Sequence, residues 1–95
     1  MAATNKSTAQ IIIDTIPLNE VQEALINEYR RRIIRYRMVN EGMKKKYGMT
    51  FEFFESKNIV KEKDFSWNVE SDAMEWEHAV EGIRYAKKKL KNLFC

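Results

Sequence analysis

The dominant pattern in the chain is a stripe of apolar residues that recurs every three or four positions between residues 19 and 47. At about 100° per residue, this spacing places the apolar side chains on one face of a helix. The stripe consists of Val21, Leu25, Tyr29, Ile33, Tyr36, Val39, Met43 and Tyr47. Asn19 can cap the start of this helix, and Gly48 stands where a helix end favours a left-handed residue. The pattern therefore predicts one long helix over residues 19–47.

The segment before this helix, residues 10–16, is rich in isoleucine and is followed by Pro17. β-Branched residues favour a short strand, but a helical turn fits so short an apolar run equally well. The pattern leaves both alternatives open. Residues 1–9 are mostly small and polar, which is typical of a flexible tail.

Two further helices are expected after Gly48. Thr50 can cap a short helix that reaches about residue 57. Residues 59–68 then form a charged connector, and a last helix is predicted over residues 70–93. One face of that helix carries Val69, Ala73, Trp76, Val80, Ile83, Leu90 and Phe94. Residues 10–95 are therefore expected to form a single, mainly α-helical domain.

Length and composition agree with a small helical protein. A chain of 95 residues allows one domain. It contains three glycines and one proline, too few turn residues for a many-stranded sandwich or barrel. Its single cysteine, Cys95, excludes an internal disulfide, and no apolar run approaches the roughly 20 residues that span a bilayer. We expect a cytoplasmic protein without a membrane span.

The length of the long helix has a consequence for assembly. A helix of about 28 residues is about 42 Å long, whereas a compact domain of this size has a radius of gyration of about 12–13 Å. Either the helix kinks near Gly42, or a second chain covers part of it. We predict a homodimer in which the long helix contributes much of the interface.

Charge is distributed in blocks along the chain, although the net charge is only +3. Residues 30–46 and 82–95 are basic, and residues 50–81 are acidic. The candidate nucleic-acid-binding residues are Arg30, Arg31, Arg35 and Arg37. On a helix, Arg30 and Arg37 border the apolar stripe on one side, whereas Arg31 and Arg35 border it on the other. This division favours packing and ion pairing over one binding row, so we expect only weak, non-specific binding of duplex DNA.

No combination of residues predicts an active site or a metal site. His78 and Cys95 are the only residues of their types, so a zinc ligand set is missing. The acids Asp72, Glu75, Glu77 and Glu81 lie on one predicted helix, and no ligand from another element is specified. We expect a protein without catalytic residues, metal or cofactor.

The aromatic residues are the more informative candidates. Trp76 lies at the centre of the last helix's apolar face, so we expect it to be buried. A thin core cannot easily bury the remaining aromatic residues as well, and large aromatic side chains often anchor interfaces. The candidate partner-binding residues are Phe51, Phe53, Phe54 and Trp67, with the core as the alternative location for each of them.

Two runs, Tyr47-Gly48-Met49-Thr50-Phe51-Glu52-Phe53-Phe54 and Asp72-Ala73-Met74-Glu75-Trp76-Glu77, carry a resemblance to a known group. Together they resemble short prokaryotic proteins that are encoded beside toxin genes and described as antitoxin-like. In that group a long helix ends in a Tyr-Gly-Met turn, and a short Phe-rich helix, an acidic connector and a Trp-Glu helix follow. The resemblance covers about residues 29–80.

The resemblance implies a protein of a toxin–antitoxin system that masks a partner toxin, often an RNase, through helices and aromatic residues. It brings no catalytic residues. Two other functions stay open on the sequence: a basic homodimeric nucleic-acid-binding protein, or a structural helical adaptor.

Overall fold

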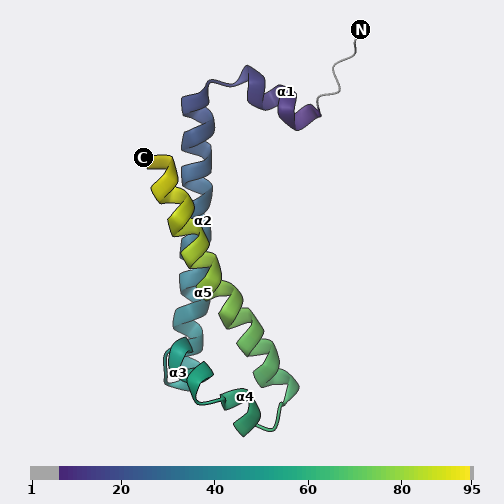
Figure 1. Cartoon of the computed structure of the whole chain (residues 1–95), viewed down its shortest axis with the longest axis vertical. Coiled ribbons are helices and arrows are strands. Elements are labelled where there is room, and N and C mark those ends of the chain that lie inside the picture. The colour runs from purple at the N-terminus through teal and green to yellow at the C-terminus, as the bar shows by residue number, and fades with distance from the viewer. Residues whose placement is uncertain (1–6, 95) are drawn as a thin grey trace.

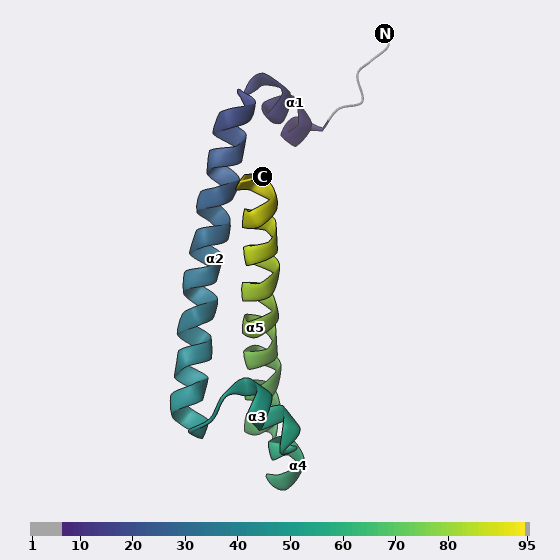
Figure 2. The same cartoon turned by 60° about the vertical axis from the view of Figure 1, so that its left-hand side comes forward.

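Two long antiparallel helices form the body of the protein (Figures 1 and 2). The computed structural model describes residues 7–94, except for the side chains of residues 9, 10, 12 and 13. The elements are α1 (Thr8–Thr15), α2 (Leu18–Tyr47), α3 (Phe51–Ser56), α4 (Ile59–Glu62) and α5 (Trp67–Phe94). The short helices α3 and α4 connect α2 to α5 at one end, and α1 projects from the other. The predicted mainly α fold is confirmed, and the described residues contain no strand.

The isoleucine-rich segment forms helix α1 and not a strand. A strand leaves its backbone groups unpaired unless a second strand lies beside it, whereas a helix satisfies them internally. Here the Ile11 amide donates to the Ser7 carbonyl at 3.1 Å, and the Thr15 hydroxyl donates to the Ile11 carbonyl at 3.1 Å. Helix α1 also includes residues 8 and 9 of the predicted flexible tail; residues 1–6 lie outside the described part of the chain.

Helix α2 is continuous, so the kink considered at Gly42 does not occur. It begins one residue before the predicted cap at Asn19, because the Pro17 carbonyl accepts hydrogen bonds from the amides of Glu20 and Val21. It ends as predicted at Gly48, whose φ of 68° is left-handed and whose amide donates to the Lys44 carbonyl at 2.7 Å. Glycine adopts this conformation without the steric cost that a side chain adds.

The short helices are set by local caps. The Thr50 hydroxyl accepts a hydrogen bond from the Phe53 amide at 3.3 Å, which confirms the predicted start of α3. The expected connector at residues 59–68 contains the single turn α4. Helix α5 begins at Trp67, three residues before the predicted start, because the Ser66 hydroxyl accepts from the Val69 amide at 3.3 Å.

The main hydrophobic core lies at the end of the body that α3 and α4 close. It consists of Phe51, Phe54, Ile59 and Trp76. Trp76 is completely buried, as predicted, and its indole N–H donates to the Asn40 side-chain oxygen at 2.8 Å. Further along the body, the small residues Ala79 and Ala86 of α5 are buried together with Ile33 of α2. The closed end is therefore the best-packed part of the chain.

Two helical glycines allow a matched prediction about packing. A methyl group at Gly42 would meet no other atom within 4 Å, whereas a methyl group at Gly82 would overlap the ring of Tyr36. We expect Gly42→Ala to stabilise the fold by about 0.5–1 kcal/mol, since alanine favours helices. Gly82→Ala should destabilise it by about 1 kcal/mol, because overpacking outweighs that gain. Thermal unfolding of both variants checks this; equal stabilisation would contradict it.

Candidate protein-binding site

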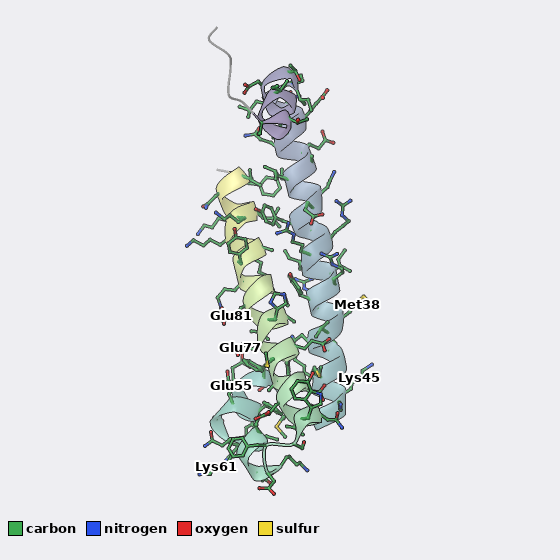
Figure 3. The ribbon with its side chains drawn as sticks, turned by 90° about the vertical axis from the view of Figure 1, so that its right-hand side faces the viewer. Met38, Lys45, Glu55, Lys61, Glu77 and Glu81 are labelled. Carbon is green, nitrogen blue, oxygen red and sulfur yellow. The ribbon has the colours of Figure 1, made fainter. Side chains whose placement is uncertain are left out.

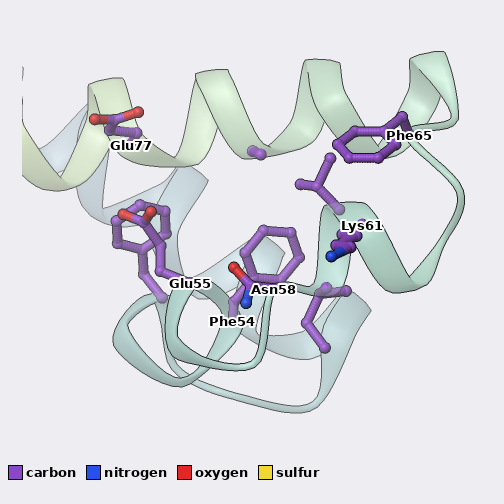
Figure 4. A pocket seen from close by; sticks show the side chains of 10 residues that line it. Phe54, Glu55, Asn58, Lys61, Phe65 and Glu77 are labelled. Atoms are coloured by element: carbon purple, nitrogen blue, oxygen red, sulfur yellow. The ribbon is translucent and has the colours of Figure 1, made fainter.

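An apolar cavity of about 290 Å³ opens between α3, α4 and α5 (Figure 4). Phe51 and Phe54 from α3, Ile59 and Val60 from α4, and Ala73 from α5 line its apolar part. The other lining residues are Glu55, Asn58, Lys61, Phe65 and Glu77. A cavity with apolar walls and a few polar groups at its edge is the usual form of a binding pocket.

Three exposed aromatic side chains belong to the same end of the molecule. Phe53 is 49% exposed, Phe65 is 58% exposed and Trp67 is 77% exposed. The Lys57 ammonium lies 5.4 Å from the centre of the Phe53 ring. Of the four predicted partner-binding residues, only Phe53 and Trp67 are thus available at the surface.

Phe51 and Phe54 are buried in the core, whereas the partner-binding prediction requires side chains that are exposed at the surface. They are 8% and 2% exposed and pack against Trp76, with ring centroids at 5.4 and 5.1 Å. The reason is geometric: α3 packs against α5 through the face that carries both residues, and Phe53 lies on the opposite face. Phe51 and Phe54 form the floor of the cavity, so a partner at the surface can contact the exposed residues at the edge of the cavity but not these two side chains.

Phe65 is an exposed aromatic residue of this site that is not among the four predicted partner-binding residues. It stands in the connector, and its φ of 54° follows a φ of 60° at Asp64. Left-handed backbone costs a residue with a side chain about 1–2 kcal/mol. Hydrogen bonds from the Phe65 amide to the Val60 carbonyl at 2.9 Å and from the Asp64 amide to the Lys61 carbonyl at 3.0 Å hold the turn. Such strain concentrates at binding sites, and here it places an exposed aromatic ring at the cavity.

The charged groups at the edge of the cavity are mostly acidic. Glu55 of α3 and Glu77 of α5 lie on one side, and Lys61 lies near Phe65 on the other (Figure 4). On the neighbouring turns, the exposed acids Glu52, Glu62, Asp64 and Glu75 outnumber the exposed lysines Lys57 and Lys63. The site therefore suits an apolar side chain that is carried by a basic surface.

Asp72, the first residue of the second run that carries the antitoxin-like resemblance, has a structural role beside this site. Its carboxylate accepts hydrogen bonds from the Tyr47 hydroxyl at 2.6 Å and from the Lys46 ammonium. Lys46 first, and then Tyr47, hold the pKa of Asp72 below its usual value. Burial, together with the bond to Asp72, raises the pKa of Tyr47 to about 12. This group ties the end of α2 to the first turns of α5.

The lowered pKa of Asp72 predicts loss of stability in acid. Because the folded-state pKa is below the unfolded value of about 3.9, Asp72 stabilises the fold above that value and loses this contribution as the pH falls through the folded pKa. We expect Asp72→Asn to be less stable than the wild type at pH 7, with the difference shrinking below about pH 4. Urea unfolding at several pH values checks this; a constant difference would contradict it.

The structure separates the four predicted nucleic-acid-binding arginines. Arg31 donates to Glu28 at 2.8 Å, and Arg32 also bonds to Glu28 at 2.8 Å. These two bonds lower the pKa of Glu28 to about 2. The Arg30 guanidinium lies 5.7 Å from the centre of the Phe94 ring on α5. Arg35 and Arg37 are exposed on opposite flanks of α2, so the four residues do not form one site.

Among the described residues, no three histidine, cysteine, aspartate or glutamate side chains come together in a way that could hold a metal ion. His78 packs edge-on against Tyr36, with ring centroids 5.4 Å apart. Cys95 lies outside the described part of the chain. Within that part, none of the helices combines the length and the apolar character that a membrane crossing needs.

Comparison with known proteins adds no relative: no family model, curated protein or solved structure matches the chain significantly. The antitoxin-like resemblance of residues 29–80 therefore stays a prediction. The physical basis for a function is the geometry of the closed end, with its cavity, its exposed aromatic residues and its acidic edge.

Proposed function

We propose that the protein acts by protein–protein contact, as an antitoxin-like protein that masks a partner toxin in a prokaryotic cytoplasm. The observation that carries this proposal is the apolar cavity with Phe53, Phe65 and Trp67 exposed at the same end of the molecule. Phe65 lines the cavity itself, whereas Phe53 and Trp67 are exposed elsewhere on α3 and at the start of α5. Large exposed apolar residues that gather at one end of a protein are typical of an interaction site.

The size of the aromatic residues supports the proposal. One aromatic side chain buries about 150–250 Å² when it is fully covered. A standard interface buries about 800 Å² on each partner, and the exposed parts of Phe53, Phe65 and Trp67 supply about a third to a half of that area. Buried aromatic anchors surrounded by polar residues also contribute most of the affinity in many complexes.

The charge of the site supports a basic partner. Residues 50–81 are acidic overall, and Glu55 and Glu77 stand at the edge of the cavity. An RNase toxin, which the resemblance implies, must attract the phosphates of its substrate and therefore carries basic residues. Carboxylates on one surface and basic groups on the other favour association of the two proteins.

The test is co-expression of this chain with the toxin encoded beside it, followed by co-purification and titration. We expect Trp67→Ser and Phe65→Ser to weaken binding at least about 30-fold, as for central interface anchors. Leu18→Ser is the matched control, because Leu18 is 71% exposed and lies at the first residue of α2, at the end of the body opposite the cavity. Failure of the two proteins to co-purify, or equal effects of all three changes, would contradict the proposal.

A homodimer remains part of this proposal. The chain extends over 62 × 29 × 17 Å, and its radius of gyration is 19.3 Å, against about 12–13 Å for a compact domain of this length. Leu25, Ile34 and Met38 of α2 are exposed, and Met38 projects from the side of α2 away from α5 (Figure 3). A second copy would cover such residues. We expect light scattering at micromolar concentration to give the mass of a dimer; a monomer mass would contradict this.

A further inference from the structure

One side of the two-helix body brings together basic residues from α2 and α5. A shallow groove between these helices is lined by Lys44 from α2 and by Arg84 and Lys87 from α5. Basic residues near the end of α5 also suit the negative end of the helix dipole. The tertiary structure adds that they lie next to basic residues of the other long helix.

The basic side continues along both helices. Arg37 and Arg30 precede Lys44 by one and two steps of seven residues, so all three lie on the same flank of α2. Arg30 reaches the ring of Phe94, which shows that this flank faces the last turns of α5. Lys91 follows Lys87 by four residues, on the next turn of the same face. We call this set the basic flank; it consists of Arg30, Arg37, Lys44, Arg84, Lys87 and Lys91.

The side chains of the basic flank are accessible. Five of the six residues are exposed, and Lys44, the one partly buried residue, still has 40% of its side-chain surface exposed. Lys44 pairs with Glu41 at 3.0 Å, and Arg84 pairs with Glu81. Both pairs lie within one helix at the surface, where such pairs contribute at most about 1 kcal/mol. Glu52 is the acid that lines the groove itself, so a clear positive excess remains.

We propose that the basic flank binds the phosphate backbone of a nucleic acid. From Arg30 to Lys44 the row on α2 is about 21 Å long, and the row on α5 runs beside it, so two parallel lines of charge can follow a phosphodiester chain. The groove between them is shallow and contains Val80 and Ile83 but no element shaped to enter a DNA groove. The binding is therefore independent of base sequence.

This inference goes beyond the proposed masking function and concerns a different surface. The cavity of the protein-binding site lies between α3, α4 and α5, whereas the basic flank runs along the body between α2 and α5 and meets the closed end only at α3, where Phe51 lines both the cavity and the groove. The substitutions chosen to test each proposal change no residue of the other surface, so a failure of either proposal can be recognised separately. Trp67→Ser should weaken toxin binding and leave nucleic-acid binding unchanged.

The test compares two triple variants with the same change in net charge. Arg30→Gln/Arg37→Gln/Lys87→Gln removes half of the basic flank. Arg31→Gln/Arg35→Gln/Lys88→Gln removes exposed basic residues of the same two helices that lie outside it. The probes are a mixed-sequence DNA duplex and a single-stranded RNA, and fluorescence anisotropy gives Kd between about 50 and 200 mM salt. Circular dichroism verifies that each variant is folded.

We expect the wild type to bind both probes with Kd of about 10⁻⁴–10⁻⁶ M at physiological salt and more tightly at low salt. The basic-flank variant should bind at least about tenfold more weakly at low salt. The slope of log Kd against log salt should fall by about 3, since each phosphate contact contributes about 0.9. The control should change affinity less than about threefold. Equal losses of affinity in both variants would overturn the proposal. It would also be overturned if the wild-type chain bound neither DNA nor RNA but bound vesicles that contain phosphatidylserine.

Discussion

Trp76→Ala is expected to lower the free energy of unfolding by about 3–5 kcal/mol, which is enough to unfold many domains of this size. Trp76 has no exposed surface, contacts Phe51, Phe54 and Tyr47, and donates a hydrogen bond to Asn40. The substitution would leave a large cavity in the main core and an unpaired amide oxygen on a half-buried asparagine. Urea unfolding monitored by circular dichroism measures the loss.

Trp67→Ala is the matched control for this prediction, because Trp67 is 77% exposed at the first turn of the same helix. We expect a change within about 0.5 kcal/mol, as for most surface substitutions. The contrast between the two tryptophans separates a structural role from a role in binding. A similar loss of stability in both variants, or an unchanged midpoint for Trp76→Ala, would show that the core is not centred on Trp76.

Phe54→Ala is expected to have the second-largest effect, a loss of about 3–5 kcal/mol. Phe54 is 2% exposed, and its ring lies 5.0 Å from Tyr47 and 5.1 Å from Trp76, centroid to centroid. Truncation would remove the contact that holds α3 against the ends of α2 and α5. Thermal unfolding should show a melting temperature far below that of the wild type.

The adjacent residue supplies the control. Phe53 is in the same helix but is 49% exposed, so Phe53→Ala should change stability by less than about 1 kcal/mol while it weakens partner binding. If Phe53→Ala proved as destabilising as Phe54→Ala, α3 would not pack against α5 through the face that carries Phe51 and Phe54. Loss of partner binding in a Phe54 variant would report unfolding, so Phe53, Phe65 and Trp67 are the residues for functional tests.

The locations of the two proposed surfaces follow from the order of charges along the chain. Residues 50–81, from the turn between the long helices to the first half of α5, are acidic overall, and most of this excess lies on α5, so acidic residues lie at or near the closed end, where the exposed aromatic residues also lie. Because α2 and α5 are antiparallel, the basic residues 30–46 and 82–95 lie side by side along the body. A protein partner at the closed end and a nucleic acid along the body would therefore not compete for the same residues.

Much of the fold could be predicted from the sequence by itself, because it depends on local interactions. The 3.6-residue period of apolar positions determines α2 and most of α5, and the left-handed preference of Gly48 ends α2 where predicted. The cap at Thr50 and the burial of Trp76 also follow from residue type and from position on one helical face. The helices and their caps depend on at most a few neighbouring residues. The place of Trp76 on the apolar face predicts its burial, but the side chains that cover it, Tyr47, Phe51 and Phe54, come from other elements.

The tertiary structure decided what depends on the meeting of separate segments. Helix α3 carries phenylalanine at three of its first four positions, so its pattern has no unique apolar face; packing against α5 buries Phe51 and Phe54 and exposes Phe53. The strained turn that exposes Phe65 depends on how α4 connects to α5. The basic flank exists only because antiparallel packing brings Lys44 beside Arg84 and Lys87, which are about 40 residues away along the chain. Sequence spacing determines which residues share one helix face, but the side chains that meet across two helices depend on their relative rotation and register.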